Sequence, residues 1–103
     1  MSVVVLNEDN FKEEVLESKE PVLVDFFATW CVPCKMMSPI LDKFSEETDG
    51  VKVCKIDTDE AMNLAREYGI MSIPCIIAFK DGKEVNRSVG LTDKKGLLKL
   101  LED

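Results

Sequence analysis

Residues 22–28 constrain the fold of this chain more than any other segment. They read Val-Leu-Val-Asp-Phe-Phe-Ala, a nearly continuous apolar run that is typical of a central strand buried on both faces. Asp25 is the one acid within this run. An acid there either satisfies a structural hydrogen bond or serves a function. Its isolation in an apolar strand favours a functional carboxyl whose pKa is raised by burial.

Four other segments have the composition and the turn boundaries of strands. They are residues 3–6, 51–56, 74–80 and 84–90. Asp81 and Gly82 separate the last two of these segments, and this pair predicts an antiparallel hairpin with a tight turn.

Helical spacing of apolar residues is found between the predicted strands. The predicted helices run from Asn7 to about Ser18, from the cysteine motif to just before Gly50, through residues 61–68, and onward from Thr92. Asn7, Thr92 and one of residues 57–59 have side chains suited to capping helix N-termini. In the last helix we expect an inward face made of Leu97, Leu98, Leu100 and Leu101.

This order of elements predicts an α/β fold, in which a mixed five-stranded sheet is flanked by four helices. With 103 residues, 46% of them hydrophobic, the chain is long enough for one compact core and too short for two. We therefore expect a single domain over residues 1–103, with helices on both faces of the sheet.

The charge of the chain argues against two classes of partner. There are 13 basic and 20 acidic residues, so the net charge of -7 repels nucleic acid and anionic lipid. We expect neither a nucleic acid nor a membrane as a partner, and we expect a monomer because nothing indicates an obligate interface. Residues 1–8 have no basic start and only a short apolar run, which predicts that the chain is not exported and stays in the cytoplasm.

The chain contains no histidine, which excludes Ser/His and Cys/His catalytic pairs and every zinc site that needs an imidazole ligand. Cys31 and Cys34 have Cys-X-X-Cys spacing, and no second pair is present to complete a zinc site. We therefore expect no metal and no cofactor on the chain. A redox role for the two cysteines is favoured over a buried structural pair.

Cys31 and Cys34 come just before a helical pattern, so they should occupy the first turn of that helix. A separation of three residues places both sulfurs on one face, close enough for a disulfide. Unpaired N–H groups and the helix dipole lower the pKa of a thiol at the N-terminus, which makes Cys31 the expected nucleophile. Cys34, further in and less exposed, is expected to resolve the mixed disulfide that Cys31 forms with a substrate.

Several segments of the chain resemble the thioredoxin family. They are Trp30-Cys31-Val32-Pro33-Cys34-Lys35, Val24-Asp25-Phe26, Lys55 ahead of Asp57-Thr58-Asp59, Ile73-Pro74, Phe79-Lys80-Asp81-Gly82 and Val89-Gly90. The likeness spans the whole chain and is far more specific than Cys-X-X-Cys alone. It implies the thioredoxin fold and a protein disulfide reductase that acts by dithiol-disulfide exchange and supports cell redox homeostasis. It also implies two partners, oxidised client proteins and a thioredoxin reductase that returns electrons.

The resemblance further implies roles for residues outside the cysteine pair. Asp25 would accept and release the Cys34 proton, and Lys55 would modulate that acid. A lysine that simply ends a strand at the surface is the alternative for Lys55. Pro74 is similar to the family's cis-proline, which lies against the disulfide. A shallow apolar groove for substrates would be lined by Trp30, Val32, Pro33, Ile73, Pro74 and Gly90.

Two positions depart from the family pattern. Val32 stands where the family usually has glycine, and its β-branched side chain stiffens the turn and adds apolar surface beside the sulfurs. Cys75 stands where threonine is common, directly after Pro74, so a third thiol is expected near the pair. Cys75 either packs a strand or modulates the redox poise, for example by capturing Cys31 under oxidation. Cys54 lies in an apolar strand and is expected to be a small buried hydrophobe.

Two other functions stay open at this point. An isomerase or oxidant of the same fold is disfavoured because the chain has neither an export signal nor an active-site histidine. A non-catalytic binding module could dock a partner through Trp30, Pro74 and Gly90, but such a module has no use for two intact sulfurs.

Overall fold

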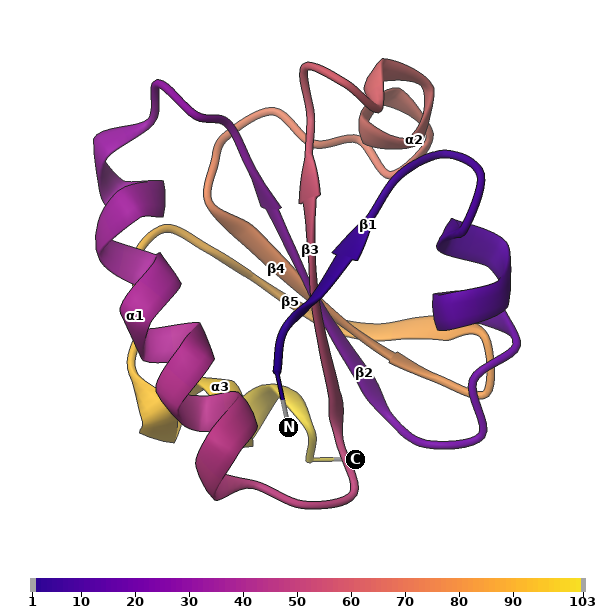
Figure 1. Cartoon of the computed structure of the whole chain (residues 1–103), viewed down its shortest axis with the longest axis vertical. Helices are drawn as coiled ribbons and strands as arrows, with labels where there is room; N and C mark the ends of the chain where they lie inside the picture. The colour runs from indigo at the N-terminus through magenta and orange to yellow at the C-terminus, as the bar shows by residue number, and fades with distance from the viewer. Residues whose placement is uncertain (1, 103) are drawn as a thin grey trace.

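The computed structural model describes residues 2–102 and contains one five-stranded sheet in the order β1-β3-β2-β4-β5 (Figure 1). The strands are β1 (Val4–Leu6), β2 (Val22–Phe27), β3 (Lys52–Asp57), β4 (Cys75–Lys80) and β5 (Lys83–Val89). The first three strands pair in parallel, while β4 pairs antiparallel with both β2 and β5. The predicted mixed sheet of five strands is therefore confirmed.

Helices cover both faces of this sheet, as predicted. They are η1 (Lys12–Leu16), α1 (Val32–Glu47), α2 (Met62–Glu67) and α3 (Lys94–Leu100). Figure 1 shows α1 and α3 together on one side of the sheet, with α2 and η1 on the other. Each pair of helices buries its own apolar cluster against the strands, one around Phe26 and Phe79 and the other around Met37 and Phe44.

Strand β2 is the centre of the fold and is buried on both faces. Val24 and Phe26 point into the cluster under η1 and α2, whereas Leu23 points into the cluster under α1 and α3. Since successive side chains of a strand alternate between faces, Asp25 shares the face of Leu23. The carboxyl of Asp25 therefore lies in the layer between the sheet and α1.

The start of α3 differs from the prediction by one residue. Asp93, and not Thr92, caps this helix, because its side chain accepts a hydrogen bond of 3.0 Å from the N–H of Gly96. The inward face is also narrower than predicted. Leu97 and Leu100 are buried and Leu101 packs against the same cluster, but Leu98 is 44% exposed, because it lies off the stripe formed by residues spaced three and four apart.

The first helix begins later than predicted, and Asn7 does not cap it. The side-chain oxygen of Asn7 accepts hydrogen bonds from the N–H groups of Asp9 and Asn10, which closes a turn ahead of the helix. Element η1 is one wide helical turn, in which the N–H of Glu17 donates to the carbonyl of Lys12 at 3.0 Å.

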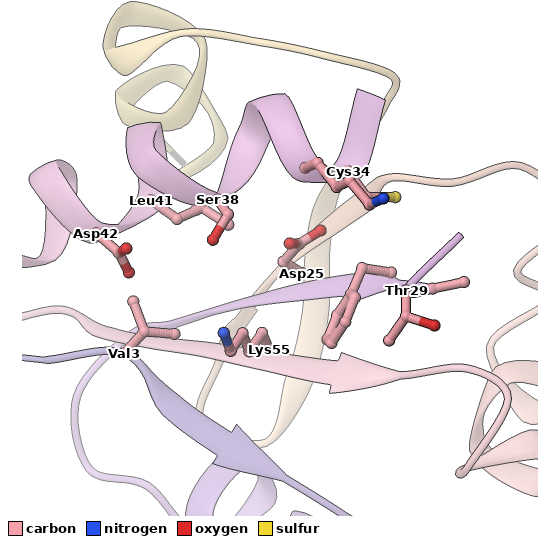
Figure 2. A pocket seen from close by; sticks show the side chains of 11 residues that line it. Val3, Asp25, Thr29, Cys34, Ser38, Leu41, Asp42 and Lys55 are labelled. Atoms are coloured by element: carbon pink, nitrogen blue, oxygen red, sulfur yellow. The ribbon is translucent and has the colours of Figure 1, made fainter. Parts of the chain in front are cut away.

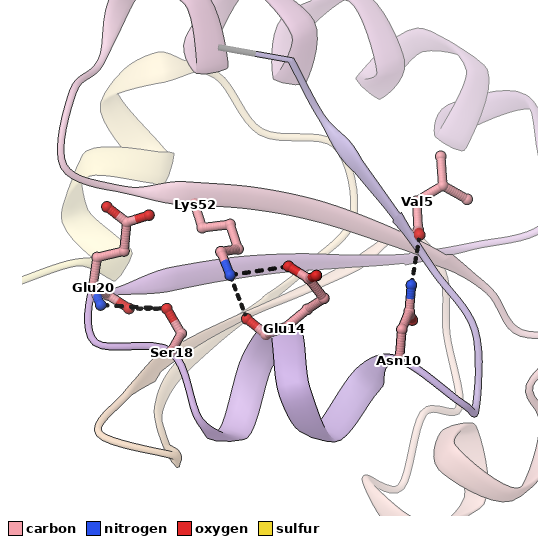
Figure 3. A network of polar contacts seen from close by, with 6 residues as sticks. All are labelled: Val5, Asn10, Glu14, Ser18, Glu20 and Lys52. Atoms are coloured by element: carbon pink, nitrogen blue, oxygen red, sulfur yellow. Dashed lines mark hydrogen bonds and ion pairs between the residues drawn. The ribbon is translucent and has the colours of Figure 1, made fainter.

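Polar contacts hold η1 against the strands (Figure 3). The ammonium group of Lys52, at the start of β3, donates to the carboxylate of Glu14 at 3.0 Å and to its carbonyl at 2.9 Å. The bond to the carbonyl of Glu14 satisfies a group that a single helical turn leaves without an intrahelical donor. After η1, the hydroxyl of Ser18 donates to the carbonyl of Glu20 at 2.9 Å, in the turn that leads to β2.

None of the three predicted candidates caps α2. The N-cap position is Ala61, which has no capping side chain, and the carboxylate of Glu8 accepts from the N–H of Asn63 in the first turn at 3.0 Å. The carboxylate of Asp57 accepts from the N–H of Asp59 at 2.9 Å, and the hydroxyl of Thr58 donates to the carbonyl of Phe27 at 3.1 Å. These side chains therefore stabilise the turn between β3 and α2 and tie it to the end of β2.

The hairpin turn between β4 and β5 is Asp81–Gly82, as predicted, and both residues have positive φ angles, 53° and 78°. A Cβ atom on Gly82 would lie 2.7 Å from the carbonyl oxygen of Leu16. The turn therefore needs glycine for two reasons: its backbone conformation and its close approach to η1.

Replacing Gly82 with alanine should lower the free energy of unfolding more than the same change at Gly50. Gly50 has φ 79°, and a Cβ atom there would meet nothing within 4 Å, so Gly50→Ala reports the cost of backbone conformation alone, about 1–2 kcal/mol. Gly82→Ala adds the clash with Leu16, roughly 1–3 kcal/mol more. Urea unfolding of the oxidised proteins measures both losses, and equal losses would contradict the contact.

Candidate active site

The two cysteines of the motif lie at the N-terminus of α1. Cys31 is the N-cap residue, with extended backbone angles, and Cys34 lies in the first turn of the helix. The two residues are joined by a disulfide, and their Cα atoms are 5.2 Å apart. The predicted pairing on one helix face is therefore present in the structure.

The sulfur of Cys31 lies at the positive end of α1. It accepts a hydrogen bond of 3.2 Å from the N–H of Cys34, one of the N–H groups that have no intrahelical acceptor. A thiolate at this position gains from the same N–H group and from the helix dipole. In the disulfide form Cys31 and Cys34 are almost equally buried, 5% and 4% exposed, so burial alone does not separate their roles.

Two loops border the disulfide. The sulfur of Cys31 is 3.8 Å from the carbonyl oxygen of Ile73, and the following Ile73–Pro74 peptide bond is cis. The N–H of Gly90 donates to the carbonyl of Pro74 at 2.8 Å, which brings the end of β5 beside this loop. Pro74, Ile73 and Gly90 are therefore gathered next to Cys31.

The surface around the disulfide exposes apolar side chains. Trp30 is 68% exposed and Val32 64% exposed, on either side of Cys31, and Pro33 is also exposed. The indole N–H of Trp30 donates to the carboxylate of Asp59 at 2.9 Å, which fixes the ring next to the turn before α2. From the sequence, Asp59 was expected only as a helix cap, and its contact with Trp30 was not predicted.

Asp25 lies behind the disulfide and is only 3% exposed. Within residues 2–102, its Oδ1 atom has no hydrogen-bond partner. Burial raises the pKa of Asp25 from its ordinary value of 3.8 to about 7, and the nearby ammonium of Lys55 opposes this rise. The carboxyl therefore exchanges its proton close to neutral pH.

Lys55 is the direct neighbour of Asp25 across the β2–β3 pair. Its ammonium nitrogen is 5.8 Å from the centre of the Phe27 ring, a distance at which a cation interacts with the ring face. Lys55 is half-buried and lies within β3, two residues before the end of the strand. Its charge acts on Asp25 through space.

A cavity of about 210 Å³ connects Asp25 and Cys34 with the surface (Figure 2). Its walls come from β2, from α1, from β3 and from the residues ahead of β1. They are Val3, Asp25, Phe27, Ala28, Thr29, Cys34, Lys35, Ser38, Leu41, Asp42 and Lys55. Because Thr29, Lys35 and Asp42 are exposed, the cavity reaches the solvent on the α1 side of the sheet.

Neither Ser38 nor Asp42 was predicted from the sequence as a site residue. The signal was present, since Cys34, Ser38 and Asp42 follow one another at intervals of four residues and so lie in one row along α1. Which row of a helix faces a cavity depends on how the helix packs, and spacing alone does not give that.

The two other cysteines are buried and unpaired. Cys54 belongs to the apolar cluster under η1 and α2, and burial raises the pKa of its thiol to about 12. Cys75 belongs to the same cluster, away from the cluster of Ala28, Cys31 and Cys34, and burial raises its pKa as well. This placement gives no support to the hypothesis that Cys75 captures Cys31.

Within residues 2–102, no group of three or more His, Cys, Asp or Glu side chains is arranged to hold a metal ion. Over the same residues, no helix has both the length and the apolar character needed to cross a membrane.

Comparisons with known proteins agree with the fold and with the cysteine pair. The family model described as Thioredoxin matches residues 2–103. A thioredoxin of Rickettsia felis is 52% identical over 94 residues, which cover 90% of each chain. A thioredoxin of Chlamydia muridarum is 48% identical over 99 residues, 96% of this chain and 95% of the relative.

A solved structure gives the same result. The thioredoxin of Malassezia sympodialis superposes with a TM-score of 0.86 and 37% identity, covering 96% of this chain and 88% of the other. The sheet order, the helix that begins at Cys31 and the match over almost the whole chain lead to one conclusion. The chain belongs to the thioredoxin family and is a thiol-disulfide oxidoreductase that works by dithiol-disulfide exchange through Cys31 and Cys34.

Proposed function

We propose a division of labour in which Cys31 attacks client disulfides, Cys34 resolves the mixed disulfide and Asp25 takes the Cys34 proton. The observation that supports this proposal is that Asp25 and Cys34 line the same cavity. The buried carboxyl of Asp25 faces this cavity, and its Oδ1 atom has no hydrogen-bond partner among residues 2–102. A carboxyl whose pKa is near 7 is matched to a proton transfer at neutral pH.

The exchange proceeds in two displacements. The Cys31 thiolate attacks one sulfur of a client disulfide, a new S–S bond forms, and the other client sulfur leaves as a thiolate. The carboxylate of Asp25 then accepts the proton of the Cys34 thiol, and the Cys34 thiolate attacks the sulfur of Cys31. The second client thiolate leaves, so the client gains two electrons and the Cys31–Cys34 pair loses two.

The positions of the two sulfurs support this order. The sulfur of Cys31 borders the exposed surface of Trp30 and Val32, whereas Cys34 lines the cavity behind the disulfide. An approaching client disulfide therefore meets Cys31 first. Cys34 is placed to exchange its proton with Asp25, not with the client.

We assign client binding to the apolar surface around Cys31. It consists of the exposed Trp30, Val32 and Pro33 and of the bordering Ile73, Pro74 and Gly90, among which Pro74 is buried. The partners in this proposal are oxidised client proteins and a thioredoxin reductase that returns electrons. We place this activity in the cytoplasm and assign it to the monomer.

Cys34→Ser should accumulate a mixed disulfide with a client, whereas Cys31→Ser should accumulate almost none. The reason is that only the first variant keeps the attacking thiolate and lacks the resolving one. Each reduced variant is mixed with a small purified disulfide-bonded protein, and intact-mass spectrometry after acid quench measures the adduct. Cys54→Ser and Cys75→Ser are the thiol-deletion controls. Equal trapping by the Cys31 and Cys34 variants would overturn the assignment.

Asp25→Asn should slow the resolution step by on the order of 100-fold above pH 7, because asparagine cannot accept the thiol proton. Below about pH 6 the two proteins should converge, since Asp25 with a pKa of about 7 is then protonated in the parent as well. Trp30 is the single tryptophan, so stopped-flow fluorescence beside Cys31 follows the step. A rate ratio that stays constant across pH would remove Asp25 as the proton acceptor.

The raised pKa of Asp25 also has a consequence for stability. Its folded-state pKa is about 7 against 3.8 when unfolded, so folding loses stability as the pH rises through this window. Asp25→Asn removes that loss. Between about pH 4 and pH 7 the free energy of unfolding of the variant should rise relative to the parent by on the order of 4 kcal/mol. Urea unfolding of the oxidised proteins at several pH values tests this. A difference in the free energy of unfolding that does not change with pH would show that the pKa of Asp25 is not raised.

A further inference from the structure

A row of three polar side chains runs along the face of α1 that is turned toward Asp25. Cys34, Ser38 and Asp42 are spaced by four residues and all line the same cavity. In Figure 2 the hydroxyl of Ser38 points from α1 toward the sheet, between the carboxyl groups of Asp25 and Asp42. The exposed Asp42 marks the end of the row that reaches solvent.

The cavity has the size and the polar groups that internal water requires. One water molecule needs about 10–15 Å³ of such space and two to four polar partners, and the cavity measures about 210 Å³. Its polar groups are the carboxyl of Asp25, the hydroxyl of Ser38, the ammonium of Lys55 and the carboxyl of Asp42. Oδ1 of Asp25 has no partner among residues 2–102, so water is the partner that the site can accommodate.

We propose that Ser38 is a positioning residue that holds a chain of water between Asp25 and the mouth of the cavity at Asp42, and so lets Asp25 exchange its proton with solvent. This inference rests on the proposed role of Asp25 as proton acceptor. It adds the route by which the proton leaves after each turnover and returns when the disulfide is reduced again.

A hydroxyl is suited to this position because it donates and accepts at the same time. The ammonium of Lys55 can only donate, and an ionised Asp42 can only accept. Thr29 carries the other hydroxyl among the lining residues, but Figure 2 shows its oxygen turned away from Asp25. Ser38 is therefore placed to pass a proton in either direction between waters.

The proton balance of the route is simple. Asp25 takes one proton from the Cys34 thiol and gives one to the adjacent water, which passes one on through the Ser38 hydroxyl. The last water releases one proton to solvent beside Asp42, so every group of the route returns to its starting state. No electron moves along this route.

Several charged and titratable groups face Asp25 from the elements around it. Lys55 comes from β3, and Cys34, Lys35 and Asp42 come from α1. Cys75, on the neighbouring strand β4, lies in the cluster on the opposite face of the sheet, and burial raises the pKa of its thiol. Among these groups Lys55 lowers the pKa of Asp25, so any test has to leave Lys55 in place.

The test compares Ser38→Thr with Ser38→Val. The two side chains have the same shape and branching, so packing and any strain ahead of Pro39 are the same in both, and only threonine keeps the hydroxyl. We expect Ser38→Thr to resolve mixed disulfides within about two-fold of the parent. We expect Ser38→Val to be slower by about 3- to 10-fold near pH 7, the rate equivalent of one hydrogen bond.

A second measurement reads the carboxyl of Asp25 directly. Carbon NMR titration of the oxidised proteins should give a higher pKa for Asp25 in Ser38→Val than in Ser38→Thr, because valine removes a donor to the water that solvates the carboxylate. Circular dichroism and urea unfolding of both variants control for folding. A purely structural role of Ser38 would leave this pKa equal in the two variants.

The outcomes separate the two proposals. If Ser38→Thr and Ser38→Val resolve at the same rate while Asp25→Asn is slow, the inference about Ser38 is wrong and the role of Asp25 stands. If Asp25→Asn resolves as fast as the parent, the proposed function itself fails. The difference between threonine and valine at position 38 should also vanish in the Asp25→Asn background, because the hydroxyl acts through that carboxyl.

Discussion

The burial of one carboxyl in the central strand is the constraint on which the site depends. β2 is paired on both edges, with β3 and β4, and is covered on both faces by helices. A charged group at Asp25 therefore has little solvent, and its pKa rises to about 7. An apolar residue there would fit the core without that cost. The proposed proton transfer accounts for an acid at this position, since Asp25 lies behind the helix turn that carries Cys31 and Cys34. Helix α1 connects this carboxyl with the redox pair. Its N-terminus supplies the N–H group that donates to the sulfur of Cys31. Its first turns place Cys34 and Ser38 over the sheet, beside Asp25.

The sequence predicted the parts of the structure that follow from local pattern. The buried run at residues 22–28, the hairpin at Asp81–Gly82 and the helix after the cysteine motif all have short-range signals, and all were confirmed. Helix caps were harder, because several polar side chains near a helix start compete for the same N–H groups. Thr92 and Asp93 are adjacent, and only the backbone of the folded chain decides that Asp93 bonds to Gly96.

The sequence pointed to the chemical groups of the site, but it did not predict the cavity around them. Cys31, Cys34 and Asp25 were named from the motif and from an acid in an apolar strand. The cavity was not, because it forms where residues from β2, β3, α1 and the start of the chain meet. The position of Cys75 was also not predictable from its neighbours in the sequence, which suggested a thiol near the cysteine pair. It follows Pro74 directly, yet it belongs to the cluster under η1 and α2, because successive side chains in a strand point to opposite faces.

The burial of Asp25 and its access to solvent place opposite demands on the fold. A more exposed carboxyl would have a pKa nearer its ordinary value of 3.8 and would be too weak a base for a thiol proton at neutral pH. A carboxyl sealed in the core would keep the right pKa but could not release its proton between turnovers. A narrow cavity beside a buried carboxyl meets both demands, because it admits water without exposing the side chain, which stays 3% exposed. In the proposed proton route, the hydroxyl of Ser38 lies inside this cavity, between the carboxyl groups of Asp25 and Asp42.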